Sequence, residues 1–116
     1  MLSELVRLGW HGDYVGVDIS PAAIELASRR TDCHAQWTVS AIENYSFRRF
    51  FDAICFLESI YYVRPAKIRG IVQKCRDHLT PKGGIFVKVC DRSRHAETIR
   101  QIESLKCDRL RLFVND

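Results

Sequence analysis

The residues best suited to chemistry stand at the end of a short apolar run, residues 14–17, which stops at the carboxylate Asp18. Ser20 and Pro21 follow at once. A serine accepts hydrogen bonds from the first N–H groups of a helix, and a proline suits the first helical position. The pattern predicts a strand that ends at Asp18 and passes directly into a helix. At such a strand end a carboxylate can accept both hydroxyl groups of a ribose. The alternative is an aspartate that only helps to cap the helix.

The spacing of apolar residues alternates between two periods along the chain, and this alternation predicts the fold class. Short continuous or alternating apolar runs predict strands, and apolar residues three or four apart predict helices between them. This order is typical of a parallel sheet with helices on both faces. We predict an α/β fold with a Rossmann-like, mostly parallel sheet of about five strands. The predicted strands are residues 14–17, 35–39, 51–57, 85–90 and 110–114, and helical patterns surround Leu5, Ile24, Ile71 and Ile99.

Two glycine-containing segments are predicted to end helices. Gly9 follows the first helical pattern and is a candidate C-cap glycine. Residues 80–84, Thr-Pro-Lys-Gly-Gly, are predicted to form a turn after the helix that begins at Pro65. The strand predicted after this turn is almost continuously apolar, as is typical of strands that are covered on both faces.

Length and charge limit the classes of protein to consider. A chain of 116 residues with a net charge of +4 is one domain at most, here residues 1–116. No stretch reaches the roughly 18 apolar residues of a membrane span, and the start has no signal-peptide pattern. We therefore expect a soluble, cytoplasmic protein that does not bind membranes. The excess of Lys and Arg is scattered along the chain, so we do not expect nucleic acid as a partner.

The cysteines and histidines do not indicate a metal site. The five cysteines lack the close C-x₂₋₄-C pairs of zinc sites, and the four histidines lack metal or triad spacing. An odd cysteine count fits a reducing compartment. Cys55, Cys75 and Cys90 fall inside apolar patterns and are predicted to be small buried hydrophobic residues.

Four segments together resemble a known family: residues 14–21, 39–47, 51–63 and 78–89. In these segments the sequence resembles the class I S-adenosylmethionine-dependent methyltransferases that act on small molecules. Within that family it is most similar to nodulation-type N-methyltransferases. The resemblance covers nearly the whole chain and implies S-adenosylmethionine as the cofactor and a small polar molecule as the methyl acceptor.

The resemblance implies roles for residues at the ends of the first two predicted strands. Asp18 would hold the ribose hydroxyls, and the side chain of Ile19 would lie against the adenine. Ser40 would lie near the adenine amino group, and the backbone N–H of Ala41 or Ile42 would reach a ring nitrogen. Ser40 stands where the family usually has a carboxylate, so this hydrogen bond becomes a neutral one of about half the strength.

The third predicted strand ends at Leu57 and Glu58, which the resemblance places among the cofactor-binding residues. Glu58 and the pair Tyr61–Tyr62 would border the methyl-donor end of the cofactor or the acceptor. Glu58 could instead begin a helix, and the two tyrosines could be core or interface residues. No catalytic residue is identified, because transfer from a sulfonium can proceed by positioning an acceptor that is already nucleophilic.

The glycine-rich loop that follows the family's first strand is missing from these residues, as is that strand itself. Gly9, Gly12 and Gly16 do not replace it, because they lie around and within the strand that ends at Asp18. We therefore expect a truncated methyltransferase domain that binds S-adenosylmethionine weakly or not at all and shows little or no turnover. In the family the missing strand lies between the strands predicted at 14–17 and 51–57.

Two alternatives remain open at this stage. The chain could be a non-catalytic remnant or interaction module that forms a homodimer through its unpaired strand edges. It could also be a nicotinamide-dependent oxidoreductase domain, whose second strand also ends in an acid. That class explains Asp18 but not the segments 40–47 and 51–63.

Overall fold

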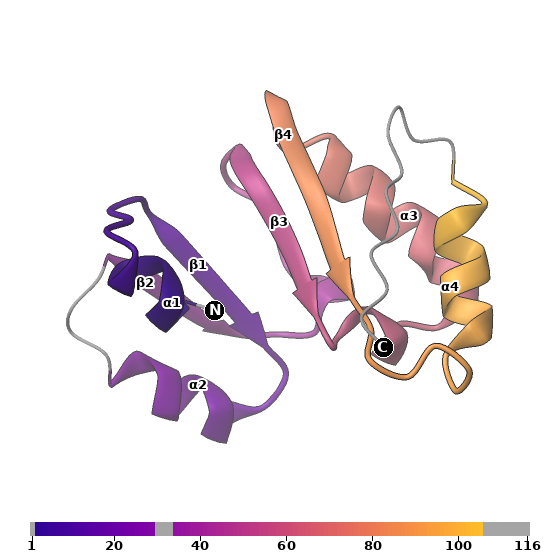
Figure 1. Ribbon diagram of the computed structural model, residues 1–116, viewed down its shortest axis with the longest axis horizontal. Helices are drawn as coiled ribbons and strands as arrows, with labels where there is room; N and C mark the ends of the chain where they lie inside the picture. The colour runs from indigo at the N-terminus through magenta and orange to yellow at the C-terminus, as the bar shows by residue number, and fades with distance from the viewer. Residues whose placement is uncertain (1, 30–33, 106–116) are drawn as a thin grey trace. The chain divides into compact units, whose positions relative to one another are not determined.

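The computed structural model describes residues 2–29 and 34–105, which form two compact units, Met1–Ser46 and Phe47–Asp116. Each unit is built from one pair of parallel strands with helices (Figure 1). The predicted α/β class with parallel strands is thereby confirmed. The predicted fifth strand, residues 110–114, and Cys33 and Cys107 lie outside the described residues. The extent of the single domain stays a prediction.

The N-terminal unit contains a βαβ arrangement. Its elements are α1 (Leu2–Arg7), β1 (Tyr14–Asp18), α2 (Pro21–Ser28), β2 (Ala35–Val39) and the 3₁₀ helix η1 (Ile42–Asn44). β1 and β2 pair in parallel with an unbroken register, in which the first residues of the two strands are partners and so are the last. Helix α2 packs against both strands. The carboxyl ends of β1 and β2 therefore lie together at one edge of this sheet.

Local signals in the sequence set the ends of the two helices of this unit. The side chain of Ser20 accepts a hydrogen bond from the N–H of Ala23 at 3.2 Å, and Pro21 is the first residue of α2, both as predicted. Gly9 ends α1 with a φ of +84°, a conformation that glycine adopts without strain. The N–H groups of Gly9 and Trp10 donate to the carbonyls of Val6 and Leu5, which makes this end a Schellman motif.

The C-terminal unit contains β3 (Phe51–Leu57), the 3₁₀ helix η2 (Ile60–Tyr62), α3 (Pro65–Arg76), β4 (Leu79–Lys88) and α4 (Ala96–Glu103). β3 and β4 are parallel, and α3 and α4 pack against each other beside β4 (Figure 1). The face of α3 that the periodicity predicts to be apolar is the buried one. The core of this unit consists of Phe56, Ile60, Val63, Ile68, Ile71, Val72 and Cys75.

The segment predicted as a turn at residues 80–84 belongs to β4, so this prediction is wrong. The ladder pairs Phe51 with Leu79 and then Ala53 with Gly84, and residues 80–83 form an irregularity within the strand. A Cβ at Gly83 would stand 3.1 Å from the carbonyl oxygens of Phe51 and Asp52, so glycine permits a close approach of two backbones. The Pro-Lys-Gly-Gly sequence therefore serves a bulged strand rather than a turn between helix and strand.

The end of β4 also differs from expectation. The strand ends at Lys88, and Cys90 is exposed in the segment beyond it, whereas burial was predicted. Cys75 is buried as predicted, and Cys55 on β3 is half-buried. The apolar run of β4 is not covered on both faces, because Phe86 is 61% exposed. An apolar run therefore predicted the strand correctly but overstated its burial.

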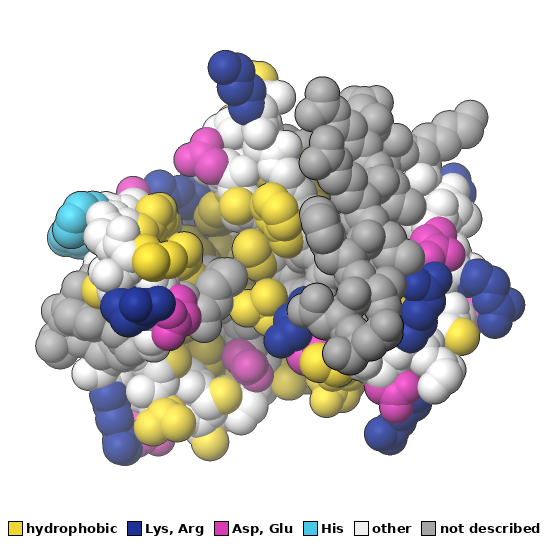
Figure 2. Space-filling model, viewed as in Figure 1, with side chains coloured by type: hydrophobic (Ala, Val, Ile, Leu, Met, Phe, Trp, Pro, Cys, Tyr) yellow, Lys and Arg dark blue, Asp and Glu magenta, His cyan; other side chains and the backbone are white. Residues whose placement is uncertain are grey.

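The surface of the described residues has a mixed charge. On the face shown in Figure 2, Lys and Arg side chains are spread among Asp and Glu side chains and do not gather in a single patch. This distribution agrees with the scattered basic residues of the sequence. Among the helices that the structure describes, none has both the length and the apolar character to cross a membrane.

Candidate functional site

Two of the predicted site segments meet at the carboxyl edge of the N-terminal sheet. Asp18 is the last residue of β1, and its register partner Val39 is the last residue of β2. The N–H of Ser40 donates to the backbone carbonyl of Asp18 at 2.9 Å, which extends the ladder by one bond. The structure therefore brings Asp18 and the segment that begins at Ser40 into direct contact, as the parallel order of the strands predicts.

The Asp18 carboxylate is exposed and partly used by the local backbone. Its Oδ1 accepts a hydrogen bond from the N–H of Ser20 at 2.8 Å. The capping alternative is therefore correct in part, because this bond holds the turn from β1 into α2. A carboxylate offers about four acceptor positions, so one backbone bond leaves capacity for further donors such as two hydroxyl groups.

Backbone and apolar groups lie near this carboxylate in the chain. Ile19, directly after β1, exposes 73% of its surface. The hydroxyl of Ser40 donates to the Ala41 carbonyl at 2.8 Å, so its oxygen keeps acceptor capacity. Ile42 begins η1, and the first N–H groups of a helical turn have no acceptor inside that turn. These residues supply an apolar side chain, an acceptor and a donor at one strand edge.

In the C-terminal unit, Leu57 and Glu58 lie at the carboxyl end of β3, as predicted. The N–H of Glu58 donates to the carbonyl of Lys88 at 3.0 Å and so continues the ladder between β3 and β4. Glu58 then adopts a φ of +55° and is the one non-glycine residue with positive φ among the described residues. A left-handed conformation of this kind costs a side-chain-bearing residue about 1–3 kcal/mol. Glu58 precedes η2 by two residues, so it also stands just before a helical turn.

The carboxylate of Glu58 has an uneven environment. Its Oε2 accepts a hydrogen bond from the hydroxyl of Tyr61 at 3.3 Å, whereas its Oε1 is buried without a hydrogen-bond partner among the described residues. The side chain and backbone of Cys90 interact with the carboxylate and, with Tyr61 and Lys88, lower the pKa of Glu58.

The same contacts shift the pKa values of the two neighbours of Glu58. The hydrogen bond to the Glu58 carboxylate, followed by burial and by the negative charge, raises the pKa of the Cys90 thiol. Burial and the Glu58 charge raise the pKa of the Tyr61 hydroxyl. Both neighbours therefore keep their protons at neutral pH, and the carboxylate keeps its charge.

His95 joins this cluster although it is not among the predicted site residues. Its ring stacks on the ring of Tyr61 with the centroids 3.9 Å apart and the planes 11° apart. Tyr61 also contacts Tyr62, which is 81% exposed. The sequence could have indicated His95 only through its position after β4, because the carboxyl ends of the parallel strands β3 and β4 lie side by side. Its contact with Tyr61 depends on how the segment between β4 and α4 folds back.

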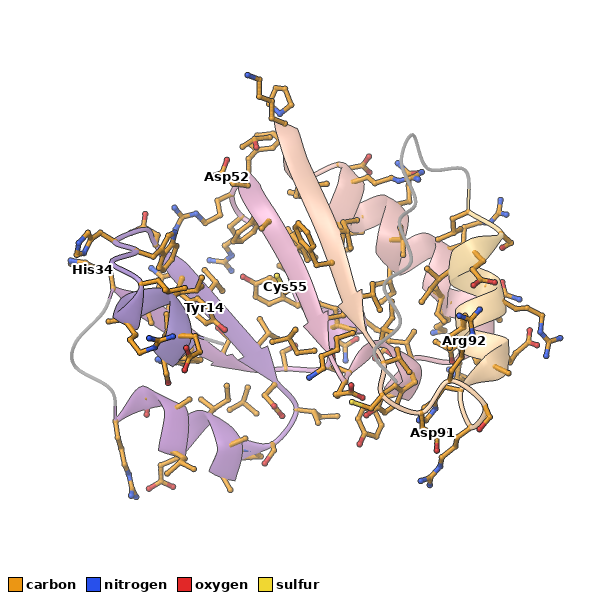
Figure 3. The ribbon with its side chains drawn as sticks, viewed as in Figure 1. Tyr14, His34, Asp52, Cys55, Asp91 and Arg92 are labelled. Carbon is orange, nitrogen blue, oxygen red and sulfur yellow. The ribbon has the colours of Figure 1, made fainter. Side chains whose placement is uncertain are left out.

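Hydrogen bonds and an ion pair fix that segment. Oδ1 of Asp91 accepts from the N–H of Arg94 and from the hydroxyl of Ser93, both at 3.0 Å. Arg92 forms an ion pair of 3.0 Å with Glu103 near the end of α4. Figure 3 shows Asp91 and Arg92 on the segment that leads from β4 to α4. The N–H of His95 donates to the Asp91 carbonyl at 3.2 Å, so the histidine is held from its own backbone.

Among residues 2–29 and 34–105, no three His, Cys, Asp or Glu side chains converge in a way that could hold an ion. The polar groups at the two strand edges are instead arranged for hydrogen bonding.

Comparison with known proteins adds one finding on the family. A family model described as a methyltransferase domain matches residues 1–83, which include β1, α2, β2, β3 and α3. Comparisons with curated proteins and with solved structures gave no match. The matched region contains Asp18, the Ser40 segment and Glu58.

Proposed function

Because the chain belongs to the methyltransferase domain family, we propose that it is an S-adenosylmethionine-dependent methyltransferase domain whose acceptor is a small polar molecule. Proteins of this family generally use S-adenosylmethionine. The observation that carries the proposal is the contact between Ser40 N–H and the Asp18 carbonyl, which gathers a carboxylate, an exposed isoleucine and a helical-turn N–H at one strand edge. A carboxylate can bind the ribose hydroxyls, an apolar side chain can cover the adenine face, and a backbone N–H can bind a nitrogen at the adenine edge.

Within this proposal each residue has one part of the cofactor to hold. Asp18 would accept the two ribose hydroxyls, Ile19 would cover the adenine, and Ser40 would accept from the adenine amino group. The N–H of Ala41 or Ile42 would donate to a ring nitrogen. Leu57 and Glu58, in the C-terminal unit, would border the methyl-donor end. The cofactor supplies an electrophilic methyl group on a sulfonium, and the protein contributes binding and orientation.

We further propose that the 116 residues by themselves bind this cofactor weakly. They contain no glycine-rich loop of the family's kind, so the amino-acid half of the cofactor would lack those backbone contacts. Losing several hydrogen bonds of about 0.5–1.5 kcal/mol each lowers affinity by orders of magnitude. Truncation, the nodulation-type subfamily and a cytoplasmic location belong to the same proposal.

Calorimetric titration tests the class of ligand. S-adenosylhomocysteine and NAD are titrated separately into the full chain at the same concentrations. The proposal expects weak binding of S-adenosylhomocysteine, seen as heat of binding, and no heat beyond that of dilution from NAD. Binding of NAD alone would defeat the proposal in favour of an oxidoreductase domain.

A second candidate function is self-association, which one observation favours. Phe86 on β4 and Leu57 at the end of β3 expose 61% and 43% of their surface. Exposed apolar groups on a parallel sheet are typical of surfaces that pair with another element. Light scattering over a wide range of protein concentration would show a mass that rises toward the dimer. A constant monomer mass would remove this candidate.

A further inference from the structure

We infer that an aromatic and basic cluster in the C-terminal unit binds single-stranded nucleic acid. The cluster lies at the edge where β3 and β4 begin and consists of residues 47–51, Lys74 and His78. Phe51 is the first residue of β3 and Leu57 the last, so this edge is at the opposite end of the strand from Leu57 and Glu58. Binding here therefore goes beyond the proposed function and does not depend on it.

Two segments that are far apart in the sequence meet at this edge. The N–H of Phe51 donates to the carbonyl of His78 at 2.7 Å, so the start of β3 contacts the chain just after α3. Phe51 is also the register partner of Leu79, the first residue of β4, and Figure 1 shows the two strands beginning side by side. Basic residues that the sequence separates, Arg48 and Arg49 before β3 and Lys74 in the last turn of α3, thereby gather at one edge. Their scattering in the sequence was the reason not to expect nucleic acid, and the fold removes it here.

Aromatic rings at this edge provide a surface on which bases can stack. Phe50 exposes 67% of its surface, and its ring centroid lies 6.2 Å from that of His78. Phe47 stacks on the same imidazole with the centroids 5.0 Å apart, and it meets the ring of Phe51 edge-on at 6.1 Å. Nδ1 of His78 donates to the Lys74 carbonyl at 2.8 Å, which fixes the imidazole beside these rings. Phe50 is therefore a supported aromatic side chain that offers its ring to solvent, and every base has a face that can stack on it.

Cationic groups stand over the same set of rings. The guanidinium carbon of Arg49 lies 5.9 Å from the centroid of Phe51, and Nζ of Lys74 lies 5.4 Å from the centroid of Phe47. A cation on an aromatic face keeps its charge, so it can still attract a phosphate. Arg48, next to Arg49 in the chain, is also exposed. Basic groups for the phosphates and aromatic rings for the bases are the two features that single-stranded nucleic acid requires of a binding surface.

Two carboxylates at the same edge oppose a polyanion. Asp52, which Figure 3 labels at the start of β3, accepts a hydrogen bond from the hydroxyl of Thr80 at 2.9 Å. Asp77, directly after α3, accepts one from the side-chain amide of Gln73 at 2.9 Å. The basic residues of the two segments outnumber these carboxylates, and they are Arg48, Arg49, Lys74 and Arg76. The balance of charge is positive, so a phosphate chain should bind weakly and in a salt-dependent way.

Fluorescence anisotropy of labelled oligonucleotides, titrated with the full chain, tests the binding. A thymidylate decamer offers bases and phosphates, an abasic decamer offers the same phosphates without bases, and a duplex hairpin keeps its bases stacked inside. At about 50 mM salt we expect the thymidylate decamer to bind with a dissociation constant on the order of 10–100 μM. The abasic decamer and the hairpin should each bind at least about fivefold more weakly, because neither can stack a base on Phe50.

Matched variants separate the contribution of the ring from that of the charge. Phe50→Ala should weaken binding of the thymidylate decamer at least about fivefold, and Phe50→Trp, which keeps an aromatic face, should retain it. Leu26→Ala removes an apolar side chain of similar exposure, 68%, from α2 and should change nothing. Arg49→Gln should weaken binding and lower the slope of log affinity against log salt by about 0.7. Arg100→Gln, on α4, removes the same charge elsewhere and should leave both unchanged.

Five results would overturn the inference. The first is the absence of binding of the thymidylate decamer up to about 1 mM protein at low salt. Equal binding of the abasic decamer, or of the hairpin, would show that bases do not stack on this edge. Unchanged affinity in Phe50→Ala would remove the aromatic contact that the binding requires. Equal affinity of thymidine monophosphate would identify a free nucleotide as the ligand and exclude a strand.

Discussion

The indole ring of Trp37 lies over Gly16, its register partner on the adjacent strand, so closely that a side chain at position 16 has no room. A Cβ placed on Gly16 would stand 2.2 Å from two carbon atoms of the indole. The ring of Tyr14 also packs near this indole, and the centroids of the two rings lie 5.4 Å apart. The packing of this sheet therefore depends on the absence of a side chain at Gly16.

Gly16→Ala should destabilise the N-terminal unit. Trp37 would have to leave its position against the sheet, and overpacking of this kind costs about 1–3 kcal/mol. Both tryptophans of the chain, Trp10 and Trp37, belong to this unit, so tryptophan fluorescence during urea unfolding measures its stability.

Gly70→Ala is the matched control for this substitution. Gly70 lies inside α3, and nothing stands within 4 Å of the position that its Cβ would take. Alanine is favoured over glycine in a helix interior by about 0.5–1 kcal/mol, so Gly70→Ala should stabilise the C-terminal unit. Because both tryptophans belong to the N-terminal unit, far-UV circular dichroism during urea unfolding measures the effect of Gly70→Ala. Equal effects of the two substitutions would contradict the close packing of Trp37 on Gly16.

Ser20→Ala should loosen the start of α2. The serine hydroxyl accepts the bond from the N–H of Ala23, and losing an N-cap acceptor costs about 0.5–2 kcal/mol. Ser20→Asp retains a capping oxygen and should recover most of the loss. Urea unfolding measured by tryptophan fluorescence would show the difference, and an identical midpoint for wild type and Ser20→Ala would contradict the role of this cap.

Glu58→Gln should make Cys90 more reactive. The hydrogen bond and negative charge of Glu58 raise the pKa of the Cys90 thiol, so a neutral amide should lower that pKa and increase the thiolate fraction near pH 8. We expect Cys90 to be alkylated roughly two- to tenfold faster, measured by peptide mapping so that each cysteine is followed separately.

Two references make that measurement specific. Burial raises the pKa of Cys75 to about 11, so this thiol should stay slow in both proteins. The exposed Glu97→Gln lies on α4 and should leave the Cys90 rate unchanged. A Cys90 rate that is the same in wild type and Glu58→Gln would show that the two side chains do not interact in solution.

The segment between β4 and α4 should loosen in acid. The backbone N–H of Arg94 and the hydroxyl of Ser93 lower the pKa of Asp91 below its usual value. A carboxyl group whose pKa is lowered by folding stabilises the folded state above its unfolded pKa, about 3.9, and loses this effect as the pH falls through the folded pKa. The Arg94 amide should therefore be protected from hydrogen exchange at neutral pH and lose this protection as the pH falls through the lowered pKa of Asp91.

Asp91→Asn provides the comparison for this pH dependence. An asparagine oxygen can still accept a hydrogen bond, but it cannot titrate, so the acid step at Arg94 should disappear. The ion pair between Arg92 and Glu103 is present in both proteins, so any effect of acid on it is common to them. Persistence of the same acid step in Asp91→Asn would assign it to another group.

Much of the fold could be predicted because local signals and tertiary packing agree. The strands Ala35–Val39 and Phe51–Leu57 have their predicted limits. Polar residues flank the first run on both sides, and Glu58 follows the second. The segment 80–84 was predicted wrongly because proline and glycine favour turns and also permit a bulged strand. Only the pairing with β3 decides between these two outcomes, and pairing is not a local property.

One part of the candidate site could be predicted from the sequence, and another part could not. Asp18 and Ser40 could be placed together from the sequence, because both follow strands that the helix between them makes parallel. The contact of His95 with Tyr61 could not, because it depends on hydrogen bonds from Asp91 that reverse the chain after β4. The exposure of Cys90 was missed for the same reason, since β4 ends two residues earlier than its apolar run.

Nuclear magnetic resonance titration with S-adenosylhomocysteine, comparing the wild-type chain with Asp18→Ala, tests the proposed cofactor site most directly. We predict weak binding, with a dissociation constant above the micromolar range, and shifts of the amide signals of Asp18, Ile19 and the segment from Ser40 to Ile42. Asp18→Ala should abolish these shifts, while Asp13→Ala, in the same unit, should retain them. Micromolar or tighter binding, or shifts that persist unchanged in Asp18→Ala, would contradict the proposal.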